Sequence, residues 1–258
     1  MALPVIILLL IIYGYSLIIF LFSLEIERDV DTSADPKDSP LCVSVVVPFR
    51  NEEDHLPGLM EDFIGQTFPA EHMEVLFVDD HSEDGSASIV TAGSSRTKHF
   101  HYLELPRKMS GKKKALSYGI QHAKHERIIQ VDADCRLGPG FVAAHMAFLE
   151  EHPSDLVAGL VSTGKGKGGF LEAYERLDLL ALLATGAGSF ALGRPMMCSG
   201  ANLSYSRDLY METRVFDPVE TTESGDDMFL MIGARKLNRT LSFNTAFEAC
   251  VETAPVTS

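Results

Sequence analysis

The sequence predicts an α/β protein in which helices flank a mostly parallel sheet, preceded by one transmembrane helix. From residue 43 onward, short apolar segments alternate with segments of helical periodicity, as in strand–helix–strand units. The first apolar segment, residues 43–48, is a continuous Val-rich run typical of a strand buried on both faces. Residues 1–24 carry no charged side chain, and a run of this length can cross a ~30 Å hydrocarbon core.

Residues 1–24 are expected to be an uncleaved membrane anchor. A cleaved signal peptide, the alternative, needs a basic first segment and a small-residue cleavage site, and neither is present. The few charged residues that follow give almost no positive-inside signal, so charge leaves the orientation of the anchor open. The polar residues 25–42 are expected to form a linker to the main domain, residues 43–258.

The spacing of apolar residues predicts the remaining elements. Residues 53–67 predict a helix with one buried face, formed by Leu56, Leu59, Met60, Phe63 and Ile64. Residues 171–184 predict a helix whose uncharged half packs in the core or lies against a membrane surface. The expected strands are residues 43–48, 74–78, 100–105, 127–131 and 156–161, and the other expected helices are residues 86–94, 112–124 and 141–151.

The composition restricts the classes of partner. The net charge is −14 at pH 7, which argues against nucleic acid as a partner. An anionic substrate would therefore need a local cation, either a metal ion or a basic side chain. The four cysteines are widely spaced and form no Cys-x-x-Cys pair, which argues against a zinc site and for thiols in a reducing compartment.

Acidic residues at strand ends are the main candidates for a functional site. One apolar strand runs into Asp132 and Asp134, and another runs into Asp79 and Asp80. In an open α/β sheet, the carboxyl ends of the strands face the crevice where ligands bind. Two carboxylates one residue apart point to the same side if the strand continues through them, and they suit Mg²⁺ or Mn²⁺ carrying a substrate's phosphates. The alternative is that these residues cap helices or form solvated turns.

Further motifs occur in order around these acidic residues. The first strand leads into Pro-x-x-Asn-Glu, the second into Val-Asp-Asp-x-Ser-x-Asp-Gly-Ser, and a Gly-Lys-Lys-Lys segment precedes the Asp-x-Asp. Gly-x-Asn and Gly-Asp-Asp segments follow downstream. The segments are residues 45–53, 78–86, 111–116, 131–134, 199–207 and 225–230. Together they resemble family 2 of the glycosyltransferases, whose members have the GT-A fold, and the resemblance extends over about residues 43–253.

The resemblance implies a binding site for a nucleotide-diphosphate sugar. Asp80 would accept the N3–H of uracil, with the backbone of neighbouring strand-end residues beside the base. Two lysines would steady the diphosphate. The residues implied in donor binding are Pro48, Arg50, Glu52, Asp80, Lys112, Lys114 and Asp132.

The resemblance also implies a Mg²⁺ or Mn²⁺ ion. Asp134 would ligate this ion, and Asp132 would lie near the ion or the ribose. Gly200 and Asn202 would lie on the acceptor side.

A catalytic base is implied as well. Asp227 is the expected base because Leu230 follows at the spacing of the family's Glu-Asp-x-x-Leu pattern, although Asp226 stands where Glu is usual. Asp226 would support the base or position the acceptor, and a capping role for the pair is the alternative.

The expected function is a metal-dependent, inverting transfer of a sugar from a UDP-sugar to a lipid or saccharide acceptor at a membrane. The expected location is the cytoplasmic face of a bacterial inner membrane, where nucleotide sugars and reduced thiols are found. The sequence ends at Ser258 without the Gln-x-x-Arg-Trp segment and later transmembrane helices of many family members. A truncated or non-catalytic nucleotide-binding domain is therefore the alternative. A nucleotidyltransferase is disfavoured because no Gly-rich basic loop directly follows the first strand.

Overall fold

The computed structural model describes residues 41–164, 169–213 and 225–253, together with Ile6, Tyr13, Gly14 and Leu17. The predicted anchor and linker therefore lie largely outside the described residues. Within the described parts of the chain, every helix is too short or too polar to cross a membrane.

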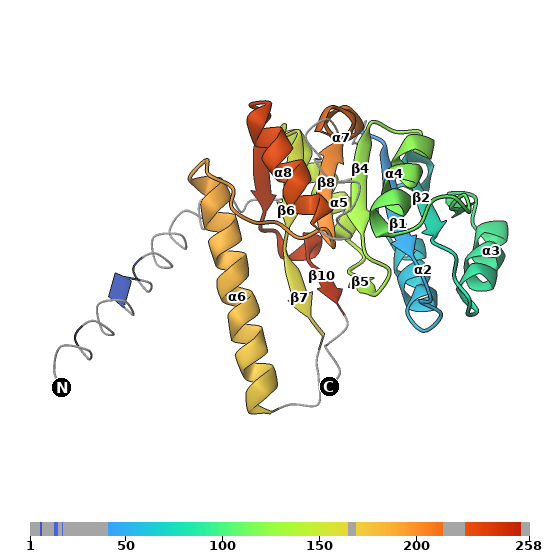
Figure 1. The fold of residues 1–258 in the computed structure, drawn as a ribbon, viewed down its shortest axis with the longest axis horizontal. Coiled ribbons are helices and arrows are strands. Elements are labelled where there is room, and N and C mark those ends of the chain that lie inside the picture. Colours follow the sequence, from blue (N-terminus) through green and yellow to red (C-terminus); the bar gives the residue numbers. More distant parts are fainter. Residues whose placement is uncertain are drawn as a thin grey trace.

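A seven-stranded mixed sheet forms the centre of the molecule, in the order β3-β2-β1-β4-β8-β6-β9 (Figure 1). The first four of these strands run parallel, β8 runs antiparallel to both β4 and β6, and β9 pairs parallel with β6. The strands are β1 (Val43–Phe49), β2 (Met73–Asp79), β3 (Phe100–Glu104), β4 (Arg127–Val131), β6 (Leu156–Gly159), β8 (Asn202–Ser206) and β9 (Leu241–Asn244).

A second sheet has three strands in the order β5-β10-β7. Its strands are β5 (Cys135–Leu137), β7 (Val161–Thr163) and β10 (Val251–Thr253), and β10 is antiparallel to β5 but parallel to β7. The helices are α2 (Leu56–Ile64), α3 (Ser86–Arg96), α4 (Lys112–His122), α5 (Phe141–Glu151), α6 (Phe170–Ala191), α7 (Arg207–Thr213) and α8 (Asp226–Lys236), with short 3₁₀ turns η2 (Ala70–His72) and η4 (Phe247–Ala249).

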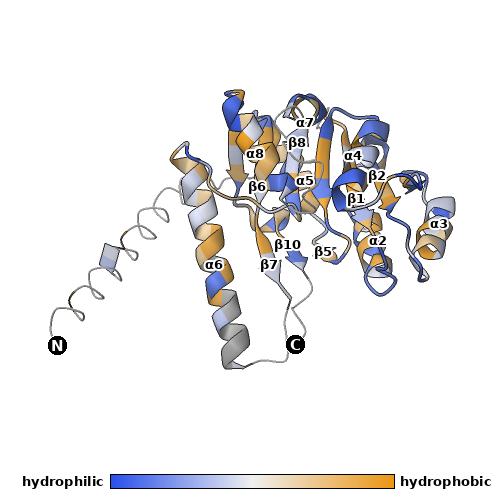
Figure 2. Cartoon of the chain, viewed as in Figure 1, coloured by the Kyte–Doolittle hydropathy of each residue, from blue (hydrophilic) through white to orange (hydrophobic). Residues whose placement is uncertain are grey.

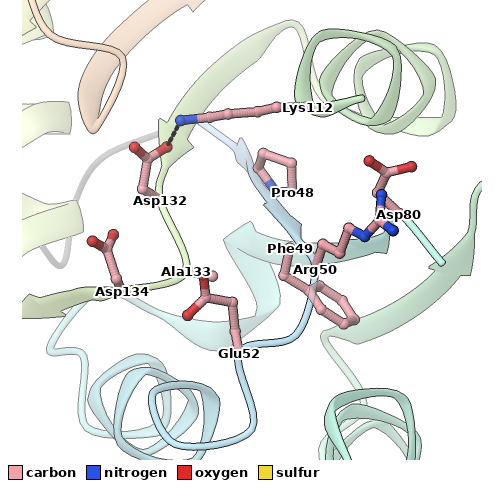
Figure 3. Close-up of a pocket in the computed structure, with 9 residues that line it drawn as sticks. All are labelled: Pro48, Phe49, Arg50, Glu52, Asp80, Lys112, Asp132, Ala133 and Asp134. Carbon is pink, nitrogen blue, oxygen red and sulfur yellow. Dashed lines mark ion pairs between the residues drawn. The ribbon is translucent and has the colours of Figure 1, made fainter. Parts of the chain in front are cut away.

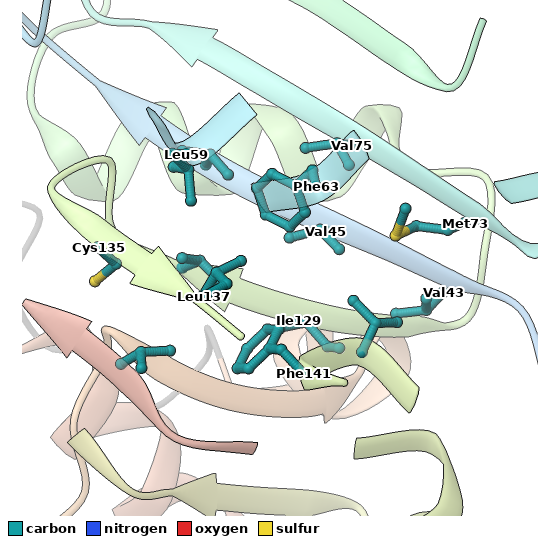
Figure 4. Packing of buried hydrophobic residues seen from close by; sticks show 14 of the residues in the cluster. Val43, Val45, Leu59, Phe63, Met73, Val75, Ile129, Cys135, Leu137 and Phe141 are labelled. Atoms are coloured by element: carbon teal, nitrogen blue, oxygen red, sulfur yellow. The ribbon is translucent and has the colours of Figure 1, made fainter. Parts of the chain in front are cut away.

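Helices cover both faces of the main sheet because its central strands are apolar on both sides. Along β1, Val45 and Val47 belong to one buried cluster, while Val46 between them belongs to the other. The first cluster includes side chains of α2, α3 and α5 and is shown in part in Figure 4. The second includes side chains of α4, α7 and α8. Hydrophobic residues follow the strands and the middle of α6 (Figure 2).

The expected strands and helices are present, although α2 is three residues shorter at each end than the expected helix 53–67, and there are three further differences. The strand expected at residues 156–161 is divided between β6 and β7, because the chain passes from one sheet to the other at Leu160, whose carbonyl accepts the N–H of Val251 at 3.1 Å. Ile64, expected on the buried face of α2, is 61% exposed because the helix ends there and the core is filled by Phe63. The helix expected at residues 171–184 continues to Ala191, and its buried end includes Phe190, which packs against Phe243.

Candidate active site

A cleft with a volume of about 320 Å³ lies at the carboxyl ends of β1, β2 and β4 (Figure 3). Parallel strands bring their carboxyl ends to the same edge of a sheet, so residues far apart in the sequence meet there. The lining residues are Pro48, Phe49, Arg50, Glu52, Asp80, Lys112, Asp132, Ala133 and Asp134. The structure thus brings together all the residues predicted for donor and metal binding except Lys114, which is exposed and not part of the lining.

The charge of this cleft is dominated by carboxylates. Four acidic side chains line it, against the two basic side chains of Arg50 and Lys112. Such a site repels a diphosphate unless an additional cation accompanies it.

Asp80 is the best placed of the predicted base-recognition residues. It is only 5% exposed, and its Oδ2 accepts the N–H of Gly111 at 2.8 Å. Its Oδ1 is buried and has no hydrogen-bond partner among the described residues. Because a buried carboxylate oxygen without a partner is costly, this atom is suited to receive a hydrogen bond from a ligand.

The neighbouring Asp79 has a structural role. Its Oδ1 accepts the N–H of Ser82 at 2.9 Å, and its Oδ2 accepts the hydroxyl of Tyr102 at 3.0 Å. Burial, together with the bond to Asp79, raises the pKa of Tyr102. Asp79 therefore organises the turn after β2, as the capping alternative predicted, while Asp80 faces the cleft.

Lys112 enters the cleft from the first turn of α4. Its Nζ lies 2.7 Å from Oδ1 of Asp132. Burial disfavours the charged form of Lys112, but Asp132, Asp226 and Asp134 outweigh this effect and raise the pKa of the lysine. Lys112 therefore carries a full positive charge at neutral pH and interacts with both the Asp-x-Asp segment and the acidic start of α8.

Asp132 and Asp134 follow β4 in a turn. Strand β4 ends at Val131, and the N–H of Cys135 closes the turn on the carbonyl of Asp132 at 3.2 Å. The strand therefore does not continue through the two residues, and strand alternation does not hold their side chains on one side. Both residues nevertheless line the cleft.

The residues at this turn fit a divalent metal ion with few protein ligands. No cluster of three or more His, Cys, Asp or Glu side chains suited to a metal is present among the described residues. Mg²⁺ and Mn²⁺ are often bound by one or two carboxylates, with phosphate oxygens completing the ligands. Asp132 and Asp134 supply such oxygens beside the ammonium of Lys112.

Asp226 and Asp227 open α8, and Asp226 interacts electrostatically with Lys112. Burial, then the neighbouring charge of Asp227, raises the pKa of Asp226, and Lys112 opposes this shift. In Asp227, Oδ2 accepts the N–H of Gly200 at 2.9 Å and Oδ1 accepts the N–H of Met228 at 2.7 Å. The structure therefore brings the predicted base into contact with the predicted acceptor segment.

Asn202 has internal contacts instead of facing the cleft. The side chain is fully buried, and its Nδ2 donates to the carbonyls of Leu160 and Ala249, both at 2.7 Å. Its Oδ1 lies 2.9 Å from Nε2 of His145. The prediction that Asn202 lies on the acceptor side is not matched by this placement, because β8 turns the side chain toward the junction of the two sheets.

Two contacts beside the site were not predicted from the sequence. Gln130 is buried, and its Nε2 lies 3.5 Å from Oδ2 of Asp226. An amide among the apolar residues at the end of a strand is a signal available in the sequence. The ammonium of Lys113 lies 5.3 Å from the ring centroid of Phe229, which joins α4 to α8. No sequence pattern indicates this pairing.

Comparisons with known proteins agree with this architecture. The family model described as "Glycosyl transferase family 2" matches residues 44–214. A poly(ribitol-phosphate) beta-glucosyltransferase of Bacillus spizizenii is 24% identical over 189 residues, which are 73% of this chain and 29% of that protein. An undecaprenyl-phosphate 4-deoxy-4-formamido-L-arabinose transferase of Shewanella sediminis is 28% identical over 166 residues, which are 55% of this chain and 50% of that protein. The chain thus spans half or less of the length of these relatives.

Two solved structures share the fold. The structure of residues 1–349 of TarS of Staphylococcus aureus, in complex with UDP-GlcNAc, has a TM-score of 0.62 at 21% identity, over 84% of this chain and 60% of that one. The mannosyltransferase PcManGT of Pyrobaculum calidifontis, in complex with GDP-Man and Mn²⁺, has a TM-score of 0.68 at 20% identity, over 95% of this chain and 66% of that one. The mixed sheet with flanking helices therefore matches the predicted GT-A fold.

Proposed function

The chain belongs to glycosyl transferase family 2, and we propose on this basis that it transfers a sugar from a UDP-sugar to a lipid or saccharide acceptor with inversion and with the help of Mg²⁺ or Mn²⁺. The observation that carries this proposal is the cleft itself. It combines a buried Asp80 oxygen, which has no hydrogen-bond partner among the described residues, with a lysine and with two carboxylates that follow β4.

Donor binding divides the cleft into two parts. Asp80 accepts the N3–H of uracil through Oδ1, while Oδ2 remains on the N–H of Gly111. That contact ties base recognition to the start of α4, where Lys112 meets the diphosphate. Asp132 and Asp134 would hold a divalent ion, which when bound would supply Lewis-acid stabilisation to the leaving nucleoside diphosphate.

The acidic pair of α8 supplies the base for the acceptor hydroxyl. Asp227 is our assignment because its carboxylate is fixed beside Gly200, at the predicted acceptor segment. Asp226 interacts electrostatically with Lys112 and has a raised pKa. It is therefore the alternative catalytic base if Asp227 has only a structural role. A single base that activates one attacking hydroxyl leads to inversion at the anomeric carbon.

The relatives support the class of substrates. The names of two relatives include poly(ribitol-phosphate) and undecaprenyl-phosphate, respectively. One structural neighbour binds UDP-GlcNAc and another binds GDP-Man with Mn²⁺. For this chain we propose a uridine nucleotide and an acceptor at the membrane. We further propose that residues 1–24 anchor the protein and that the catalytic domain lies on the cytoplasmic side of a bacterial inner membrane.

Thermal unfolding with ligands tests the proposal. UDP with Mn²⁺ should stabilise the protein by about 2.7 kcal/mol at roughly 100 times the dissociation constant. A chelator should abolish this gain, and Asp134→Asn should reduce it. If the chelator does not change the stabilisation by UDP, the proposed metal ion has no role in nucleotide binding. Stronger stabilisation by GDP than by UDP contradicts the assignment of Asp80 to uracil recognition.

A further inference from the structure

We propose that Asp62 of α2 is a positioning residue that fixes the turn carrying Asp134 relative to the base-binding end of the cleft. The inference rests on the proposed function, because it assigns to Asp62 a role in metal-dependent donor binding. Asp62 does not line the cleft and belongs to none of the motifs described above.

Asp62 binds strand β5 through both carboxylate oxygens. Its Oδ2 accepts Nε of Arg136 at 2.7 Å and its Oδ1 accepts Nη2 of Arg136 at 2.8 Å. Oδ2 also accepts the backbone N–H of Leu137 at 2.9 Å. The side chain of Asp62 is only 13% exposed. A bidentate contact between arginine and carboxylate, combined with a contact to a backbone N–H, fixes both the orientation and the distance of the two partners. Strand β5 therefore has one defined position on α2.

Gln66 and Thr67, which follow directly after α2, extend this attachment along the chain. Nε2 of Gln66 donates to the carbonyl of Gly138 at 2.8 Å, and its Oε1 accepts the N–H of Val142 at 3.0 Å. The N–H of Thr67 donates to the carbonyl of Pro139 at 2.8 Å. The whole segment that follows the Asp-x-Asp turn is therefore bound to the end of α2.

The turn itself is short and has little freedom of its own. Only three residues, 132–134, separate β4 from β5. On its other edge β5 pairs with β10. Since β4 is fixed in the main sheet and β5 is fixed by Asp62, the position of Asp134 follows from the position of these two strands.

The opposite end of α2 joins the base-binding side. The carbonyl of Glu52, a cleft residue, accepts the N–H of Leu56 at 3.0 Å where the helix begins. The N–H of Glu52 donates to Oγ of Ser86 at 2.8 Å. Helix α2 thus connects the loop after β1 with the loop after β4, and it sets the separation between base and diphosphate sites that one donor must span.

Removing this attachment should weaken metal-dependent binding more than folding. An ion pair with an exposed partner contributes little to global stability, and Arg136 is 57% exposed, whereas Asp62 is 13% exposed. The Asp62→Asn variant still offers one acceptor oxygen to the N–H of Leu137, so that the backbone contact can be kept. Residues that orient metal ligands from outside typically affect metal affinity by about 10–100-fold. Asp62→Asn should therefore raise the apparent dissociation constant for Mn²⁺ by about tenfold or more, with a small change in the unfolding midpoint.

The test is a titration of the UDP-saturated full chain with Mn²⁺, followed by electron paramagnetic resonance. The variants are Asp62→Asn and Arg136→Lys. Arg136→Lys keeps the positive charge but loses the bidentate contact. Glu61→Gln is the matched control, because it removes one negative charge from an exposed position on the same helix near Arg136. Weaker Mn²⁺ binding in Asp62→Asn and Arg136→Lys, with wild-type binding in Glu61→Gln, supports the positioning role.

Other outcomes overturn it. Unchanged Mn²⁺ binding in folded Asp62→Asn shows that the contact does not position the turn. An equal loss in Glu61→Gln shows that only the summed charge of α2 matters. If circular dichroism shows that Asp62→Asn does not fold, Arg136→Lys and Arg136→Gln decide in the same way. If the wild-type chain binds UDP without any dependence on Mn²⁺, the metal part of the proposed function fails as well, which is distinct from a variant that behaves as wild type.

Discussion

Replacing Asp227 by Asn separates catalysis from structure at the start of α8. The carboxylate accepts two backbone N–H groups, from Gly200 at 2.9 Å and from Met228 at 2.7 Å. Asn offers a single acceptor oxygen, so one of these hydrogen bonds is lost. A lost hydrogen bond of this kind costs about 0.5–1.5 kcal/mol of unfolding free energy.

The expected loss of activity is larger than this structural cost. General-base catalysis contributes about 10²–10⁴-fold to rate, which corresponds to roughly 2.7–5.4 kcal/mol of activation free energy. A domain with a typical stability of about 5–15 kcal/mol stays almost fully folded after losing about 1 kcal/mol. A hundredfold drop in turnover therefore cannot arise from unfolding.

The assay measures sugar transfer and nucleotide binding in the same preparation. Asp227→Asn should bind UDP and Mn²⁺ as the wild type does, while its turnover falls by about 10²-fold or more. Asp226→Asn is the paired variant, because it removes the adjacent charge and leaves the contact with Gly200 in place. Near-normal transfer in Asp227→Asn would refute the assignment, and a collapse in Asp226→Asn would then move the base to Asp226.

Three further predictions concern other parts of the protein. Asp80→Asn should weaken UDP binding by roughly 10–150-fold in calorimetry, because hydrogen bonds to charged groups contribute about 1.5–3 kcal/mol; unchanged affinity would contradict base recognition by Asp80. Burial lowers the pKa of His145 to about 4. As the pH falls, this histidine is therefore protonated in the unfolded chain, near the ordinary pKa of histidine, at a higher pH than in the folded chain. The free energy of unfolding should then fall as the pH drops from about 6.5 to about 4, by at most about 3 kcal/mol. In denaturant titrations, His145→Gln should make this pH dependence weaker; an equally strong pH dependence in the variant would show that His145 is not its source. Residues 1–24 should keep the intact chain in the membrane fraction after a carbonate wash, and a shortened, exported form would contradict the anchor.

The sequence predicts, for a physical reason, which strand-end residues meet in the cleft. Apolar runs that end in Asp80 and Asp132 reveal both the strand and the end at which ligands bind. The order of the strands in the sheet then brings these residues together without any further information. Figure 3 shows the result, with Lys112 and Asp132 paired across the cleft.

Tertiary contacts explain the parts that the sequence does not predict. Asp62 and Arg136 are separated by 74 residues, and no local pattern indicates their pairing. Asn202 matches a motif, but the junction of the two sheets places the carbonyl of Leu160 beside it, and the amide of Asn202 turns inward to donate to that carbonyl. Such contacts depend on where elements meet, whereas strand and helix periodicity depends only on neighbours in the chain.

Release of nucleoside diphosphate from a panel of nucleotide sugars tests the central claim most directly. The full chain is incubated with each nucleotide sugar, with Mn²⁺ or Mg²⁺, and with membrane lipids as the source of acceptor. The account predicts release of UDP from a UDP-sugar, dependent on the metal and reduced in Asp134→Asn. Release of pyrophosphate, or the absence of turnover with every nucleotide sugar despite metal-dependent UDP binding, would contradict it.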